Sequence, residues 1–277
     1  MKLVISTITL FILTFPSDSW ALHLRLPDRA YQGDLIVGQV EPVGTVTLKG
    51  KKLPVSSEGY FLIGVPRQQK TDVLITAMHG KKKVSGTVMV MAYKWKVQRV
   101  DGLQKRHVSP PPKAVVRIKN DNKKVRGIRQ AGVHPVPLFL SGGFITPVKG
   151  RITGVYGSQR ILNGQPRRPH SGLDIAAAKG TPVVSPANGI VRLVARDLYL
   201  MGNTLMIDHG LGLVSIFIHL DSISAGEGER VAQGDVVARV GQTGRTTGPH
   251  LHWGISVGST TIDPARLPKK ENFLPRR

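Results

Sequence analysis

Short β-rich runs separated by glycine, proline and charged turns recur along most of the chain, and this pattern constrains the fold most strongly. Between residues 22 and 108 the runs include "DLIVGQV", "GTVTLKG", "GYFLIGVP" and "DVLITAMHG". Their length, and a spacing of roughly ten residues, predict a small β-sandwich of the immunoglobulin-like type. Alternation of apolar and polar residues in "TVMVMAYKWKV" predicts one long strand with a buried face.

Glycine-punctuated strands return from about residue 141, after a different kind of segment. Helical periodicity is nearly absent from "TPVKGRITGVYG", "NTLMIDHG", "GLVSIFIHL" and "HLHWGISV", so residues 141–268 are predicted to form an antiparallel β domain. The segment between, residues 109–140, begins with the stiff "SPPPK" and continues with apolar residues at a partial helical period. It is predicted to be either a short helix lying across the second domain or a loosely ordered basic linker. The fold class is therefore mainly β.

The first residues have the pattern of an export signal. One lysine precedes an apolar run in "MKLVISTITLFILTF", and small residues stand at the end of "SDSWA". This predicts a signal peptide, residues 1–21, removed after Ala21, with a retained membrane anchor as the alternative. The mature protein is then exported, to the periplasm or the cell wall.

Composition limits the partners and the kinds of site. The chain has no cysteine, which excludes disulfides and cysteine-bound zinc, so a metal site must use His, Asp or Glu. The net charge is +22, and it is uneven: residues 22–146 carry 22 basic and 7 acidic residues (+15), against 16 and 9 (+7) in residues 147–277. Such a surface attracts polyanions. No nucleic-acid motif is present, which leaves anionic cell-wall polymer, lipid headgroups, or a solvated surface without a partner.

Five of the histidines cluster in the second domain, at residues 170, 209, 219, 250 and 252. In "PHSGLDIAA", His170 precedes Asp174 by four residues, and Gly172 between them is expected to allow a tight bend. An imidazole and a carboxylate arriving from one bend can share a metal ion. His250 and His252 lie in a strand pattern, where residues two apart point to the same face, so both can reach one site.

At these residues the second domain resembles the lysostaphin/LytM-type zinc endopeptidases of bacterial cell walls. The resemblance covers roughly residues 141–268 and rests on "RITGVYGSQR", "HSGLDIAAAKGTPVVSPANGIV", "GNTLMIDHGLGLVSIFIHL", "GERVAQGDVVARVGQTGRTTGPHLHWGI" and "IDPARL". It implies a groove floored by an antiparallel sheet with one zinc ion at its base. It further implies that His170, Asp174 and His252 are the metal ligands and that His219 and His250 are unliganded catalytic histidines.

The chemistry is consistent with these residue types. Three protein ligands leave a fourth position for water, as in catalytic zinc sites, and the absence of "HExxH" leaves proton transfer to histidine. Either His219 or His250 could be the base. Phe217 stands where the family commonly has tyrosine, and His209 is expected to be structural. Asn203, Tyr156 and Arg160 are predicted to line the substrate groove.

These patterns predict an exported zinc endopeptidase that cuts peptide cross-links of peptidoglycan. A non-catalytic cell-wall binding protein, or an activator of other hydrolases, is the alternative. A carrier module is disfavoured, because no lysine stands at a hairpin tip. The bond cut stays open between D-Ala–diaminopimelate, which the compartment favours, and a pentaglycine bridge.

Overall fold

The structure is a computed structural model that describes residues 21–130 and 134–267. The predicted signal peptide up to residue 20 lies outside these residues. So do residues 269–277, which their lysines and arginines predict to be a basic tail. Among the helices in the described part of the chain, none is long and apolar enough to cross a membrane.

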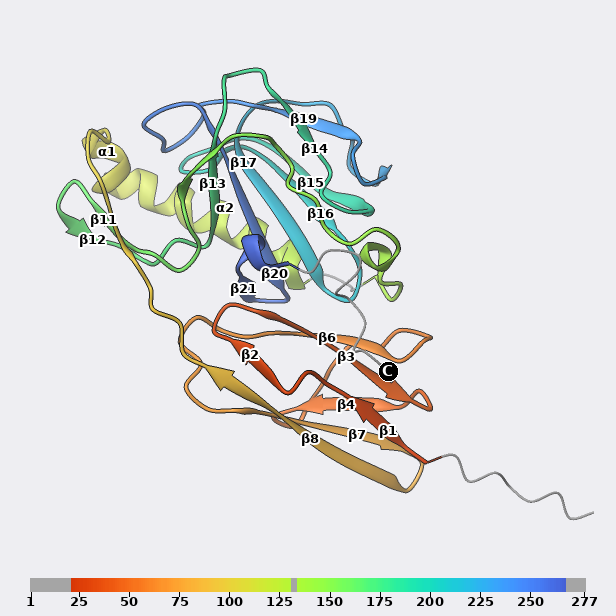
Figure 1. Cartoon of the computed structure of the whole chain (residues 1–277). Helices are drawn as coiled ribbons and strands as arrows, with labels where there is room; N and C mark the ends of the chain where they lie inside the picture. Colours follow the sequence, from red (N-terminus) through yellow and green to blue (C-terminus); the bar gives the residue numbers. More distant parts are fainter. Residues whose placement is uncertain (1–20, 131–133, 268–277) are drawn as a thin grey trace, which may run out of the picture.

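The N-terminal half is a β-sandwich, the lower half of the molecule in Figure 1. Its first sheet has the order β1-β3-β6 and its second the order β2-β8-β7-β4-β5. A core of apolar side chains, among them Ile36, Phe61 and Ile75, fills the space between the sheets. The sandwich agrees with the sequence pattern, and its immunoglobulin-like topology stays a prediction. The strands are β1 His23–Arg25, β2 Arg29–Tyr31, β3 Leu35–Glu41, β4 Thr45–Leu48, β5 Lys51–Lys52, β6 Tyr60–Gly64, β7 Val73–His79 and β8 Lys82–Met91.

The C-terminal half is built on a ten-stranded antiparallel sheet, as the sequence predicts. Seven strands follow the order β10-β13-β20-β17-β16-β15-β18, with β14, β19 and β21 paired beside this path. The apolar core against this sheet includes Phe217, Leu251 and Trp253. Strands β11 and β12 belong to a separate small sheet with the order β12-β11-β9, where β9 is Val97–Val100. The strands of this half are β10 Arg151–Gly154, β11 Gln159–Leu162, β12 Gln165–Pro166, β13 Gly172–Ala176, β14 Pro182–Val184, β15 Gly189–Leu198, β16 Gly202–Asp208, β17 Leu213–Ile223, β18 Arg230–Val231, β19 Val236–Val240, β20 His250–Val257 and β21 Thr260–Ile262. Two 3-10 turns are η1 Leu138–Ser141 and η2 Pro264–Arg266.

A long helix, which lies between the two β regions in the sequence, packs across the sheet of the C-terminal half. After the single-turn α1, Lys105–Val108, helix α2 runs over Pro112–Gln130, with proline at its first position, where no backbone N–H is needed. Val125 is buried against Leu193 and Met206 of β15 and β16, and Ile128 packs beside it. Of the two alternatives for this segment, the structure shows the helix, and it is 19 residues long rather than short.

The structure differs from the sequence prediction at residues 87–100. A long strand with one covered face is present, but it ends earlier than expected: β8 ends at Met91, and β9, Val97–Val100, begins a different sheet. Trp95 lies in the break, where its ring packs against Tyr93 and edge-on against Tyr156. Strand β9 then pairs in parallel with β11 of the C-terminal half. Residues 97–108, which the sequence pattern grouped with the sandwich, therefore lie against the C-terminal half.

The two halves share a packed interface. Val37 and Leu62 of the sandwich belong to the core of the C-terminal half. Arg67 donates from Nε to the Gly157 carbonyl at 2.7 Å, and Arg266 pairs with Asp34 at 3.1 Å. Because apolar packing and partly buried charged groups both cross it, the interface holds the sandwich and the sheet in one arrangement.

Candidate active site

Three side chains that could hold a metal ion meet where strands β13 and β20 pair. The register places Asp174 directly opposite His252, so both side chains leave the same face of the sheet. His170 lies just before β13, and its Nε2 is 3.0 Å from Asp174 Oδ1 and 2.9 Å from His252 Nδ1. His252 Nδ1 is 2.7 Å from the same carboxylate oxygen. The predicted ligands thus form one group of ligand atoms, all within 4.8 Å of one another.

Gly172 has a different role from the one expected. It lies in extended strand β13 and makes no tight bend. A Cβ at this position would stand 2.5 Å from the Trp253 carbonyl oxygen and 2.8 Å from His252 Nε2. Glycine is therefore needed because the ring of His252 lies against the backbone, not because the chain turns.

Three of the histidines are held by the same kind of hydrogen bond. The Nδ1 atoms of His170, His219 and His250 lie 3.0, 2.7 and 2.9 Å from the backbone carbonyl oxygens of Val155, Thr243 and Gly248. A carbonyl oxygen only accepts, so Nδ1 carries the proton and Nε2 of each neutral ring has a free lone pair. His252 presents Nδ1 to the group instead. Backbone bonds of this kind orient metal-binding imidazoles and set their tautomer.

His219 reaches the site through an irregularity in β17. Its φ is +65°, in the left-handed region that non-glycine residues seldom adopt, and the β16–β17 register shifts at this point. Its own N–H donates to the Met201 carbonyl at 2.9 Å. A bulge of this kind re-aims a side chain. The His219 ring lies with its centroid 4.8 Å from that of His250.

Burial and the neighbouring charges set the protonation states. Burial alone would raise the pKa of Asp174, but hydrogen bonds from His170 and His252 outweigh it and hold that pKa well below 3.8. Burial lowers the pKa of His252 to about 4, although Asp174 opposes the shift. Burial, followed by the charges of His250 and His252, lowers the pKa of His219 to about 3. His219 and His252 are therefore neutral at pH 7, while Asp174 is ionised.

The donor set is suited to a metal ion. One carboxylate and two imidazole nitrogens converge, and their side chains are at most 9% exposed. A bound cation needs a lone pair on each ligating nitrogen, because ligating histidines must be neutral at the ligating atom, and His170 Nε2 offers one when its Nδ1 proton is on the Val155 carbonyl. Two imidazoles and one carboxylate with an open position are the ligand set of a catalytic zinc site.

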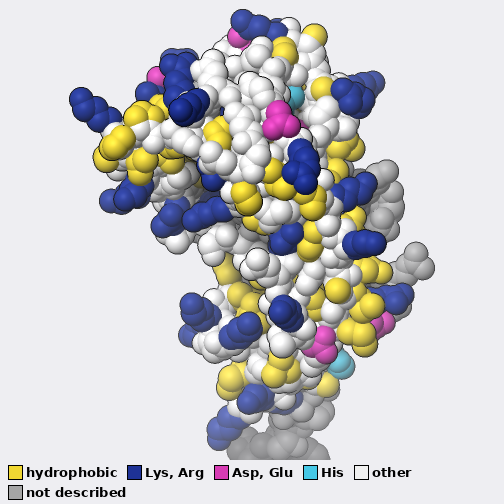
Figure 2. Space-filling view, turned by 90° about the vertical axis from the view of Figure 1, so that its left-hand side faces the viewer, with side chains coloured by type: hydrophobic (Ala, Val, Ile, Leu, Met, Phe, Trp, Pro, Cys, Tyr) yellow, Lys and Arg dark blue, Asp and Glu magenta, His cyan; other side chains and the backbone are white. Residues whose placement is uncertain are grey.

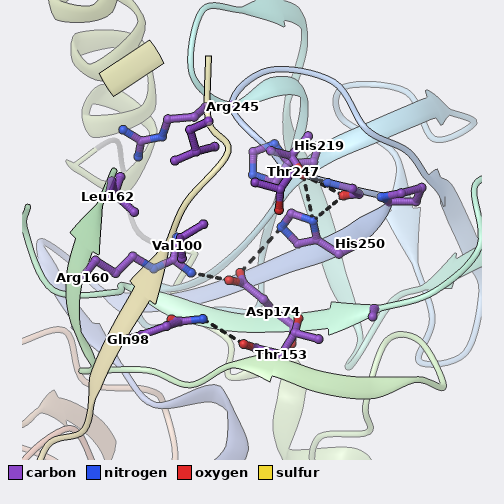
Figure 3. A pocket seen from close by; sticks show the side chains of 15 residues that line it. Gln98, Val100, Thr153, Arg160, Leu162, Asp174, His219, Arg245, Thr247 and His250 are labelled. Carbon is purple, nitrogen blue, oxygen red and sulfur yellow. Dashed lines mark hydrogen bonds and ion pairs between the residues drawn. The ribbon is translucent and has the colours of Figure 1, made fainter. Parts of the chain in front are cut away.

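A pocket of about 250 Å³ opens beside this group (Figure 3). His219, His250 and Asp174 line one part of it, and Thr153 and the loop Arg245–Pro249 line more. Gln98, Val100 and Leu103 complete the wall from the segment that joins the two halves. No sequence motif identifies these three residues, since only the β9–β11 pairing brings this segment to the groove. Thr246 could have been predicted from the sequence, because it lies in the loop just before His250. The Thr246 hydroxyl is 3.1 Å from His250 Nδ1.

The three predicted groove residues have different positions. Arg160 lines the pocket and forms an ion pair with Asp174 Oδ2. Tyr156 does not line it: this residue is buried between the halves, and its hydroxyl donates to the Thr261 carbonyl at 2.7 Å. The Asn203 side chain also stays outside the lining, with its amide bonded to the carbonyls of Leu220 and Asp221. The structure therefore does not bring Tyr156 and Asn203 to this pocket.

His209 is fully buried and lies apart from the metal-binding group. Its Nδ1 is 2.8 Å from the Asn188 carbonyl oxygen and its Nε2 is 2.7 Å from the Ser215 hydroxyl. Both ring nitrogens thus have partners within the fold, which agrees with the structural role expected from the sequence.

Known proteins are similar to this chain in the region that holds His170, Asp174 and His252. The family model described as peptidase family M23 matches residues 168–264, which include all five site residues. Residues 168–264 are thus a peptidase M23 domain. A crystal structure of a peptidase M23 from Pseudomonas aeruginosa superposes with a TM-score of 0.65 at 27% identity, covering 85% of this chain and 93% of that one. The shared arrangement thus extends beyond the M23 domain into the N-terminal half.

Two curated relatives are similar over the second half of the chain. The peptidoglycan DD-endopeptidase ShyB of Vibrio cholerae is 40% identical over 147 residues, which is 50% of this chain and 32% of the relative. The DD-carboxypeptidase/endopeptidase Mpg of Neisseria meningitidis is 38% identical over 128 residues, 46% of this chain and 29% of the relative. The chain thus spans about a third of the length of these two relatives. Their similarity concerns the M23 part.

Proposed function

We propose that this protein is an exported, zinc-dependent endopeptidase that hydrolyses peptide cross-links of peptidoglycan. The observation that carries the proposal is the convergence of His170, Asp174 and His252 beside His219 and His250 in one groove of an M23 domain. The names of the two relatives, which refer to peptidoglycan and to DD-peptide bonds, support the substrate class.

His170, Asp174 and His252 would hold one Zn²⁺ at the base of the groove. When bound, the ion supplies a Lewis acid that polarises the scissile carbonyl and activates the attacking water. Arg160 positions the carboxylate, because its guanidinium occupies Asp174 Oδ2 and leaves Oδ1 directed at the two imidazoles.

His219 and His250 divide the proton transfer. Neutral His219 has its Nδ1 proton on the Thr243 carbonyl, so its Nε2 accepts a hydrogen bond and holds the attacking water. The His250 side chain is more open, at 17% exposed, and its Nε2 lies 3.9 Å from Asp174 Oδ1. We assign to His250 the proton that the water loses, which then passes to the amine nitrogen as the C–N bond breaks.

The proposal is tested by incubating the zinc-loaded mature chain with purified sacculi and identifying the released fragments by mass spectrometry. A new amine and a new carboxyl group at a cross-link are expected, and the Asp174→Ala protein should release none. Sacculi that stay intact with a folded, zinc-loaded protein would reject the enzyme and favour the non-catalytic alternative.

The N-terminal half is proposed to bring the enzyme to its anionic substrate. Lys and Arg side chains cover both halves of the face in Figure 2, with few acidic ones among them. Electrostatic attraction of this kind is screened over roughly 8 Å at physiological ionic strength. Sacculus binding by the full mature chain should therefore weaken steadily as salt rises in a co-sedimentation assay. Binding that is independent of salt would contradict this role.

A further inference from the structure

One arginine in the active-site pocket is left without a partner. Among the described residues, the Arg245 guanidinium makes no hydrogen bond and no ion pair, although this residue lines the pocket and is half-buried. Burial lowers its pKa, and the charges of Arg160 and Arg167 lower it further. An unpaired cation held near two others is an arrangement that an anion would stabilise.

The loop that carries Arg245 is fixed to the catalytic residues. The N–H of Arg245 donates to the Leu200 carbonyl at 2.9 Å. Gly244 before it has a φ of +74°, and a Cβ there would stand 2.5 Å from the Gly202 nitrogen. Thr243 accepts the His219 proton through its carbonyl, and Thr246 lies beside His250 Nδ1. The position of Arg245 relative to both catalytic histidines is therefore set by the backbone.

The two neighbouring arginines, Arg160 and Arg167, already have partners, but one N–H donor of Arg160 is still without one. Arg160 pairs with Asp174, while Arg167 donates to the carbonyls of Val108 and Pro166. The Nε–H of Arg160, however, is buried and has no partner. Arg245 and Arg160 thus hold unused donors on the same pocket.

The side of the pocket that holds these donors also has an apolar surface. In Figure 3, Arg245 and Arg160 lie on one side with Val100 and Leu162 between them, and His219 and His250 lie on the other. Such a surface suits a residue with an aliphatic stem and a terminal carboxylate, since arginine binds carboxylates through paired N–H donors.

We propose that Arg245, assisted by Arg160, binds a free carboxylate of the substrate stem peptide and so selects carboxylate-bearing cross-links over glycine bridges. This rests on the proposed function. The carboxylate occupies the end of the groove away from the catalytic histidines, so it belongs to a glutamate or diaminopimelate residue flanking the bond that is cut. Arg245 acts in substrate recognition and takes no part in proton transfer.

The test uses three cross-linked stem peptides: one with free carboxylates, one amidated at glutamate and one amidated at diaminopimelate. The zinc-loaded wild-type protein should prefer the free peptide by about 10- to 100-fold in kcat/KM over one of the amidated forms, as expected for a charge-assisted hydrogen bond. Arg245→Gln should erase that preference through KM. Arg230→Gln, at an exposed position outside the pocket lining, removes the same charge and should keep the preference.

A binding measurement separates this inference from the proposed function. The product peptide with free carboxylates should bind the zinc-loaded wild-type protein about 10- to 100-fold more tightly than it binds Arg245→Gln, by titration calorimetry. If nothing is hydrolysed but this difference is found, the proposed function fails and the Arg245 site stands. Equal binding to both proteins, or the same preference among the three peptides in both, overturns the site.

Discussion

The two halves of the molecule differ in what they bury. In the N-terminal sandwich, the buried polar side chains are Gln39 and Ser56, and the rest of the buried core is apolar. His23 and His79 of this half are exposed. The C-terminal half buries several hydroxyl side chains and, in addition, four histidines and two aspartates. These six residues are His170, Asp174, Asp208, His209, His219 and His252.

This difference separates the scaffold from the chemistry. A buried polar group costs free energy unless hydrogen bonds compensate it, and each buried histidine of the C-terminal half has such bonds. Four of the six groups lie at the metal-binding group or beside it. Polar burial therefore marks the site, with two exceptions: Asp208, which pairs with Arg192, and His209, which is just as buried and lies apart from the site.

Removing the carboxylate should have the largest effect. Asp174→Ala deletes one of the proposed metal ligands and leaves Arg160 unpaired beside the imidazoles. We expect zinc content near zero by metal analysis and loss of essentially all activity. Asp34→Ala, which removes a carboxylate between the halves, is the control and should keep both. Full zinc occupancy in Asp174→Ala would reject the assigned ligand set.

Removing either unliganded histidine should have the next largest effect. His219→Ala and His250→Ala should keep zinc but lose activity by about 10²- to 10⁴-fold, the range for general acid–base groups. Turnover of a soluble cross-linked peptide, measured beside zinc content, checks both. Near-normal turnover removes the residue from the mechanism. If His250→Ala loses zinc and His252→Ala keeps it, the two residues have exchanged roles.

The joining segment should matter more than its place in the sequence suggests. A fragment of residues 141–277 contains all five site residues but lacks β9, Leu103, Val108 and the packing of Val125 on the sheet. Exposing a fully buried leucine such as Leu162 costs roughly 1.5–3 kcal/mol. A fragment of residues 93–277 should therefore unfold at a higher urea concentration than the fragment of residues 141–277, and it should bind substrate more tightly. Equal stability and equal KM would show that the segment is dispensable.

The sequence predicted the C-terminal sheet and the order of its site residues because both depend on local patterns. Strand alternation placed His250 and His252 on one strand, and the resemblance assigned their different roles. The β9–β11 pairing joins residues about sixty positions apart, and its three pocket residues carry no motif, so the groove wall could not be predicted. Tyr156 and Asn203 were placed in the groove by type alone, whereas tertiary hydrogen bonds use their polar atoms elsewhere.

The unpaired arginine was missed for a related reason. "GQTGRTTG" identifies a turn, but no pattern within it shows that the guanidinium lacks a partner or that Arg160 lies on the same pocket. Partner relations of this kind arise only when the loop packs against Gly202 and Leu200. Local sequence thus identifies the residues that carry a motif, and packing decides which other side chains reach the site and which of them are free to bind.

His209 gives the smallest effect on activity and the sharpest test of the comparison, because its burial should affect stability alone. Burial lowers its pKa to about 4, from about 6.5 in the unfolded chain. Between these two values the unfolded state binds a proton that the folded state does not, so the free energy of unfolding is highest above pH 6.5 and falls as pH drops toward 4. At one pKa unit per 1.36 kcal/mol, this loss is about 3 kcal/mol.

His209→Gln removes the titrating group. Between pH 6.5 and pH 4, the free energy of unfolding of this variant should therefore fall by about 3 kcal/mol less than that of the wild type. The measurement is urea unfolding of the two metal-free proteins, in which the other histidines contribute equally. Activity at neutral pH should stay close to that of the wild type in any folded His209→Gln protein. Parallel pH profiles for the two proteins would show that burial of His209 is not what makes the C-terminal half sensitive to acid.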